Sequence, residues 1–172
     1  VLGCGGGEPR SIGAYGHSAG AHLALMLAMV PKSAGLEGDG GWQDQSSLVN
    51  VAVGGSPPTE LGRDMPMAKK EWWPIGYIAA GHPPMLLIQG GADPIVRPER
   101  TGDFVEKMKT AGADLQYLKI DGAGHSVAYD QKLEVTDPAI AKFLADHLHP
   151  QTAPAQASVN PESNDVVIED GG

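Results

Sequence analysis

The feature that most restricts the fold of this chain is the pentapeptide G-H-S-A-G at residues 16–20. Residues 11–15 are short and partly apolar and predict a buried strand, whereas residues 19–30 are rich in Ala, Leu and Met and predict a helix that stops at Pro31. A serine on a tight strand-to-helix turn needs a glycine on either side, because a Cβ there would collide with neighbouring backbone. We therefore expect Ser18 to lie on a strained turn, with its hydroxyl lifted clear of a sheet.

Further strand and helix candidates alternate along the chain. Strands are predicted at residues 48–53 and 115–120, and the continuous apolar run 85–89 is typical of a strand buried on both faces. Helices are predicted at residues 98–111 and at residues 137–148, with Pro138 at the first position of the second helix. Strands that alternate with helices indicate the α/β class with a largely parallel sheet.

Composition limits the partners that the chain can have. With 172 residues, 41% hydrophobic and 19% charged, it has the size and balance of one globular domain. The net charge is -9 and no stretch concentrates Lys and Arg, which argues against nucleic acid and anionic membranes as partners. Cys4 is the only cysteine, so an internal disulfide and a multi-cysteine zinc site are excluded. The longest apolar run, residues 23–30, is too short to span a bilayer.

The two ends of the chain differ from its middle. The sequence starts at Val1 within a glycine-rich stretch, and we expect an N-terminally truncated chain whose compartment and oligomeric state cannot be assigned. Residues 150–172 hold Pro, Gln, Ala, Ser and Asn with acidic but no basic residues, and predict a disordered tail. The expected division is therefore an α/β portion at residues 1–149 and an acidic tail at residues 150–172.

Two more polar residues follow predicted strands. Asp93 comes shortly after residues 85–89, and His125 shortly after residues 115–120. The carboxyl ends of parallel strands meet at one edge of a sheet, so both side chains should lie near Ser18. A nucleophilic serine needs a base, and the base needs an orienting carboxylate. We predict a triad of Ser18, His125 and Asp93, with the Ala19 N–H as an oxyanion-hole donor.

Other residues compete for these roles. Asp121 and Asp130 are alternatives for the acid, and together with His125 they form a conceivable metal site. Among the remaining histidines, His17 should point away from Ser18. The others are expected to pack locally or to end helices: His22, His82, His147 and His149.

These segments resemble the α/β-hydrolase esterases. GHSAGAHLALMLA is similar to their nucleophile region, and HPPMLLIQGGADPIV followed by GAGHS is similar to their acid and histidine segments. GGEPRSI before the elbow resembles the carbohydrate-esterase-like group that includes acetyl-xylan and feruloyl esterases. The resemblance, over roughly residues 5–148, implies part of an α/β-hydrolase fold, the C-terminal half of its sheet. It also implies hydrolysis of short-chain acetyl or aryl esters, on small molecules or carbohydrate, through an acyl-serine without a cofactor or metal.

The sequence departs from that group at two points. The upstream HGG motif that completes the oxyanion hole is absent, so no second donor is assigned. Ala21 replaces the usual glycine, a pattern also found in kynurenine-formamidase-like enzymes. An amide hydrolase of that kind or of the prolyl-oligopeptidase kind is thus an alternative, although the latter predicts a G-x-S-Y-G-G elbow. A non-catalytic relative that serves as a binding module is the third alternative.

Aromatic residues gather in the irregular segment 56–84, where a pocket wall often lies. Trp72, Trp73 and Tyr77 are the candidates for stacking on a sugar. We expect them to pack in the core or in loops instead.

Overall fold

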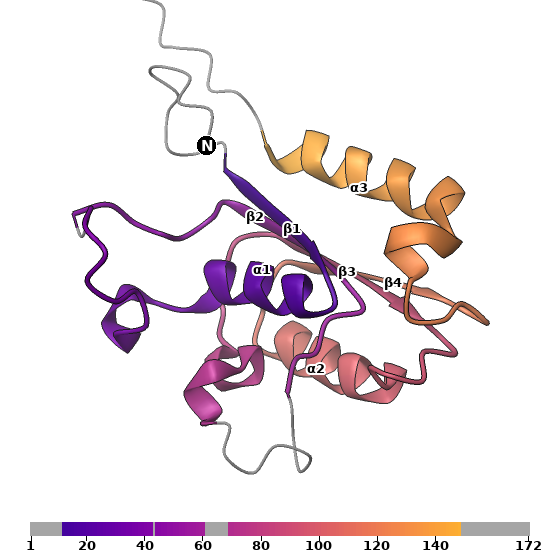
Figure 1. Ribbon diagram of the computed structural model, residues 1–172, viewed down its shortest axis with the longest axis horizontal. Coiled ribbons are helices and arrows are strands. Elements are labelled where there is room, and N and C mark those ends of the chain that lie inside the picture. Colours follow the sequence, from indigo (N-terminus) through magenta and orange to yellow (C-terminus); the bar gives the residue numbers. More distant parts are fainter. Residues whose placement is uncertain (1–11, 43, 61–68, 149–172) are drawn as a thin grey trace, which may run out of the picture.

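The structure is a computed structural model that describes residues 12–42, 44–60 and 69–148. Four strands of these residues form one parallel sheet: β1 (Gly13–His17), β2 (Val51–Gly55), β3 (Met85–Gly90) and β4 (Leu115–Ile120), in that spatial order (Figure 1). The predicted α/β class with a parallel sheet is confirmed. The predicted acidic tail at residues 150–172 lies outside the described residues.

Helices cover both faces of the sheet. Helices α1 (Ala19–Met29) and α2 (Pro98–Thr110) lie on one face, and α3 (Leu133–His147) lies on the other (Figure 1). Short helical turns complete the connections: η1 (Lys32–Ala34), η3 (Lys70–Trp72), η4 (Pro74–Tyr77) and the single π-turn η5 (Val127–Gln131). No helix in these described ranges is both long and apolar enough to cross a bilayer.

The alternation of side chains along the central strands produces two separate cores. In β3, Met85 and Leu87 pack against α1 and α2, whereas Leu86 and Ile88 pack against α3. Successive residues of a strand point to opposite faces, so a strand with helices on both faces must be apolar throughout. This explains why residues 85–89 show no polar alternation in the sequence.

The predicted bounds of three elements were wrong. The strand predicted at residues 11–15 is β1 (Gly13–His17), and its residues are exposed or half-buried, not buried. The strand predicted at residues 48–53 is β2 (Val51–Gly55), and the Asn50 N–H just before it donates to the Ile12 oxygen over 2.8 Å. Helix α3 begins at Leu133, so Pro138 lies inside it and not at its first position. The buried stripe of α3 starts at Thr136, before the proline, and burial outweighs the one backbone hydrogen bond that proline cannot donate.

Glycine permits a close backbone approach at two strand ends. A Cβ on Gly16 would overlap the carbonyl of Gly20 and lie 2.8 Å from the Ala21 nitrogen. A Cβ on Gly90 would overlap the backbone of Ala123 and Gly124. The expectation that Gly20 is equally restricted was wrong, since within the described residues a Cβ placed there meets no atom within 4 Å apart from its chain neighbours and the backbone of its own helix.

This difference predicts opposite effects for two matched substitutions. Gly16→Ala should lower the free energy of unfolding by about 1–3 kcal/mol, because backbone has to move to admit the methyl group. Gly20→Ala should leave that free energy unchanged or raise it by up to about 1 kcal/mol, because alanine is the better helix former. Urea unfolding followed by circular dichroism measures both. Equal effects of the two variants would contradict the packing described for Gly16.

Candidate active site

The structure brings Ser18, Asp93 and His125 together at the carboxyl edge of the sheet. Ser18 follows β1, Asp93 follows β3 and His125 follows β4. The His125 Nε2 atom lies 3.0 Å from the Ser18 hydroxyl, and its Nδ1 atom lies 2.9 Å from the Asp93 carboxylate. One imidazole therefore connects the hydroxyl to the carboxylate through two hydrogen bonds.

Ser18 lies on a strained turn between β1 and α1. Its φ of 53° and ψ of -118° fall outside the regions that residues with a side chain normally occupy. The Ser18 N–H donates to the Gly55 oxygen over 2.8 Å, and its carbonyl accepts from the His22 N–H over 3.0 Å. The next residue, Ala19, begins α1, so its N–H has no acceptor within the helix.

The Asp93 carboxylate is buried, with only 4% of the residue exposed, and accepts four hydrogen bonds. Oδ1 accepts from the N–H groups of Ile95 and Val96, over 2.8 and 3.0 Å. Oδ2 accepts from His125 and from the Gln89 side chain. Burial alone would raise the pKa of Asp93, but the hydrogen bonds from His125 and from the two amides outweigh burial and lower that pKa. The carboxylate is accordingly charged at neutral pH.

Gln89 and Thr101 support Asp93, and the sequence analysis missed both. Gln89 is fully buried at the end of β3, and its amide donates to Asp93 over 3.0 Å and to the Val96 oxygen over 3.1 Å. The Gln89 oxygen in turn accepts from the buried Thr101 hydroxyl over 2.9 Å. The one available signal was a glutamine within an apolar strand, where a buried amide needs partners.

The segment that carries His125 is fixed by a second contact. The Ser56 hydroxyl, at the end of β2, donates to the His125 backbone oxygen over 2.7 Å. Ser56 has a φ of 46°, so two serines at neighbouring strand ends have left-handed backbone. The ends of β1, β2 and β3 thus all contribute to the placement of one imidazole.

His17 packs against the imidazole of His125, a contact that the sequence did not reveal. The two ring centroids are 5.0 Å apart in an edge-to-face arrangement, and Tyr129 stacks on the other side of His17 at 5.9 Å. Burial, and then the proximity of His125, lower the pKa of His17, although Asp93 and Asp130 act in the opposite direction. Both effects favour a neutral His17 beside His125.

The competing candidates do not join this cluster. Asp121 and Asp130 are exposed, and the hydrogen-bond partner of His125 is Asp93. Among the residues that the structure describes, no group of three could hold a metal ion. The His22 Nε2–H donates to the Trp72 backbone oxygen over 2.7 Å, and the His82 Nε2–H donates to the Tyr77 backbone oxygen over 2.7 Å. His147 packs on Phe143, and His149 lies outside the described residues.

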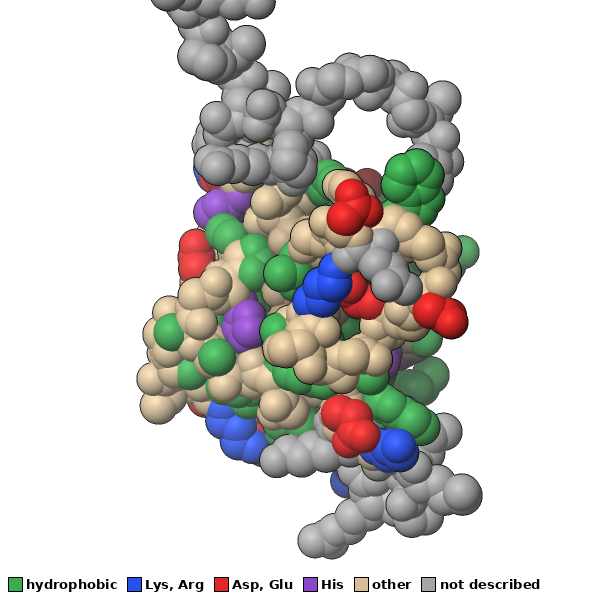
Figure 2. All heavy atoms as spheres, turned by 90° about the vertical axis from the view of Figure 1, so that its left-hand side faces the viewer, with side chains coloured by type: hydrophobic (Ala, Val, Ile, Leu, Met, Phe, Trp, Pro, Cys, Tyr) green, Lys and Arg blue, Asp and Glu red, His purple; other side chains and the backbone are tan. Residues whose placement is uncertain are grey.

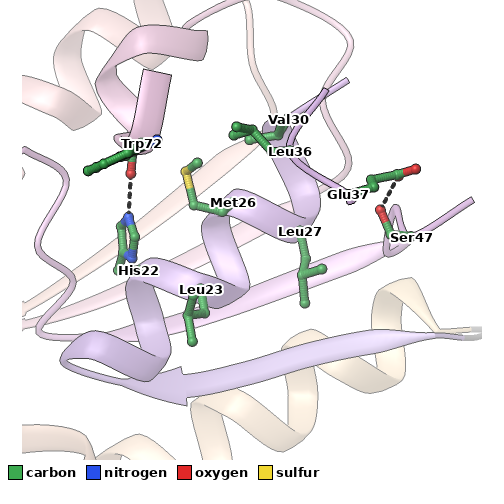
Figure 3. A pocket seen from close by; sticks show the side chains of 9 residues that line it. All are labelled: His22, Leu23, Met26, Leu27, Val30, Leu36, Glu37, Ser47 and Trp72. Atoms are coloured by element: carbon green, nitrogen blue, oxygen red, sulfur yellow. Dashed lines mark hydrogen bonds between the residues drawn. The ribbon is translucent and has the colours of Figure 1, made fainter. Parts of the chain in front are cut away.

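Two hollows adjoin His22. A cavity of about 310 Å³ opens beside Ser18 and Ala19, and Trp73 forms part of its wall. A larger groove of about 610 Å³ runs along the outer side of α1, where Leu23 and Leu27 line it and Trp72 flanks His22 (Figure 3). The predicted packing role fits Trp73, which is 9% exposed and whose ring centroid lies 4.9 Å from that of His22.

The face of the molecule in Figure 2 carries basic and acidic side chains without a continuous patch of either sign.

Comparison with known proteins extends the similarity beyond the site. The sequence pattern of the prolyl oligopeptidase family matches residues 62–151, a range that includes Asp93 and His125. Esterase LipQ of Mycobacterium tuberculosis is 26% identical in an alignment that covers 83% of this chain and 38% of LipQ.

Solved structures of an esterase share the fold. Thermogutta terrifontis esterase 2 phosphoramylated by tabun matches with a TM-score of 0.71 and 30% identity, over 83% of this chain and 58% of that one. The butyrate-bound structure of the same thermophilic esterase matches with a TM-score of 0.70 and 28% identity, over 83% of this chain and 59% of that one. The chain thus spans less than two thirds of each of these relatives.

The family match covers more than half of the 172 residues, and the parallel sheet with helices on both faces is shared with the solved esterases. From the sequence this family was only an alternative, because the second half of the elbow differs from G-x-S-Y-G-G. The chain belongs to the prolyl oligopeptidase family and has part of the α/β-hydrolase fold.

Proposed function

We propose that this chain carries the catalytic residues of a serine hydrolase that cleaves short-chain carboxylic esters. The observation that carries the proposal is the continuous hydrogen-bonded chain from the Ser18 hydroxyl through His125 to the buried Asp93 carboxylate. A serine hydroxyl is a weak nucleophile by itself, and an adjacent imidazole held by a carboxylate is the arrangement that activates it.

The proposed reaction has two halves. In the first, His125 Nε2 takes the Ser18 proton as Oγ attacks the ester carbonyl, and the imidazolium then protonates the departing alcohol to leave an acyl-serine. In the second, His125 removes a proton from water, which attacks the acyl-serine, and returns it to Ser18 as the acid leaves. Asp93 holds the imidazole in one orientation and stabilises its positive charge. The Ala19 N–H is positioned at the start of α1 to stabilise the oxyanion.

The preference for esters with a short acyl chain is supported by the relatives and by the cavity. The relatives are named esterases, and one of the matching structures has butyrate bound. The cavity of about 310 Å³ beside Ser18 is at the small end for ligand sites, which suits an acyl group of a few carbons. A carbohydrate as the alcohol part, including an acetylated or feruloylated one, stays a prediction from sequence.

Membership in the prolyl oligopeptidase family favours amide hydrolysis as a second candidate function. The same three residues would serve, with His125 protonating an amine as the leaving group. Parallel assays of a p-nitrophenyl ester and of the p-nitroanilide with the same acyl group distinguish the two. The ester proposal expects turnover of the ester with no measurable turnover of the anilide, whereas an amide hydrolase turns over both.

A fluorophosphonate should form a single covalent adduct on Ser18. We expect mass spectrometry of the treated chain to show one added phosphonyl group that maps to the peptide containing this residue. Ser18→Ala should abolish the adduct, and Ser47→Ala, which removes an exposed hydroxyl far along the chain, should retain it. An unmodified wild-type chain would contradict an activated serine at this position and would favour a non-catalytic relative. An adduct that survives in Ser18→Ala would also contradict it, because the reactive group would then be at another residue.

The identity of the acid can be tested by three matched substitutions. Asp93→Asn should lower kcat for a p-nitrophenyl ester on the order of 10⁴-fold, because the asparagine amide favours the wrong tautomer of His125. Asp121→Asn and Asp130→Asn should leave kcat within about twofold, because neither side chain bonds to His125. Near-normal turnover in Asp93→Asn would show that another carboxylate orients the imidazole.

A further inference from the structure

We propose that the cavity beside Ser18 selects esters that carry a carboxylate group, and that Arg97 is the residue that binds this group. The inference rests on the proposed function and names its substrate class. All substrates of this class would carry a carboxylate group a few atoms away from the ester bond. It can belong to the acyl part, as in a monoester of a dicarboxylic acid, or to the alcohol part.

The first support is the position of two arginines. Arg97 and Arg100 line the same cavity as Ser18 and Ala19. Arg97 is the residue directly before α2, and Arg100 lies in the first turn of that helix. The chain has four arginines and a net charge of -9, and two of the four meet at the cavity beside the proposed nucleophile.

The second support is the balance of charge around the cavity. Among the described residues that line the cavity, Glu60 is the one acidic residue. Asp93 lies nearby, but its two oxygens already accept four hydrogen bonds. Within the described residues, Arg97 forms no ion pair. The N-terminal end of the 13-residue helix α2 adds partial positive charge at the same place.

The third support is the apolar character of the remaining wall. Pro58, Trp73, Ile95 and Val96 line the space between Ser18 and the arginines. A short hydrocarbon linker fits such a wall. A guanidinium binds a carboxylate through two parallel hydrogen bonds, a geometry that lysine cannot reproduce. The cavity is thus suited to a small ligand that is apolar in its middle and anionic at its far end.

Kinetics with matched esters test the selection. The acyl arm compares phenyl hydrogen succinate with phenyl pentanoate, and the alcohol arm compares 4-acetoxybenzoate with 4-methylphenyl acetate. We expect the wild type to show a kcat/KM about tenfold or more higher for the charged ester in one arm, and Arg97→Gln to remove most of that ratio. Arg97→Lys should retain part of it. Lys107→Gln, which neutralises a charge on the same helix about 15 Å away, should change neither rate.

The arm that shows the preference identifies which part of the ester carries the carboxylate. A wild type without preference in either arm, or a ratio that is the same in Arg97→Gln, would overturn the proposal. If Arg97→Gln lowers kcat/KM equally for the charged and the uncharged ester, the arginine supports the fold or the site in general. That result would also overturn the proposal.

A binding measurement separates this proposal from the proposed function. In the Ser18→Ala variant, which cannot turn over an ester by the proposed route, isothermal titration with monoethyl succinate and with ethyl pentanoate reports affinity alone. We expect the charged ester to bind and the additional Arg97→Gln substitution to weaken it about tenfold or more. If the wild type hydrolyses no ester while this Arg97-dependent binding persists, the proposed function fails and the anion site stands. Equal affinity with and without Arg97 would overturn the anion site.

Discussion

The site depends on how closely backbone can approach backbone where the strands end. Gly16 admits the first turn of α1, and Gly90 admits the segment that carries His125, each within the space that a methyl group would fill. Gly55, at the end of β2, is similarly close to Ala128 and to the His17 ring. Because interiors are packed as densely as crystals, such contacts cannot be widened without displacing the side chains that they hold. The distances around His125 therefore follow from main-chain packing before any side chain is considered.

A buried polar network carries the charge at this edge. The Asp93 carboxylate would be costly to bury alone, but two amides, the Gln89 side chain and the His125 ring satisfy its oxygens. Thr101 extends the network into α2. The orientation of the imidazole is thereby tied both to the sheet and to a helix on its surface, so the acid has one position relative to the base.

Much of the fold and of the candidate site could be predicted from sequence, for physical reasons. The apolar run 85–89 and the elbow at residues 16–20 each have few alternative structures, and the order of Ser18, Asp93 and His125 follows the parallel strands. The start of α3 could not be predicted, because tertiary burial at Thr136 overrode the local signal of Pro138. The contact of His17 with His125 was missed because it joins residues that are far apart in sequence. Gln89 lies only four residues from Asp93, but its place in an apolar run concealed the role of its amide. The family itself was only an alternative, because the elbow of this chain differs from the G-x-S-Y-G-G pattern expected for it.

The register of the parallel sheet sets the tolerance of the site. Ser18 follows β1, Asp93 follows β3 and His125 follows β4, and two hydrogen bonds connect the three side chains. A slip of one strand by one residue would displace its end by about 3.3 Å, which neither hydrogen bond could span. A substitution deep in the sheet that shifts its register would therefore remove the alignment without touching any of the three residues.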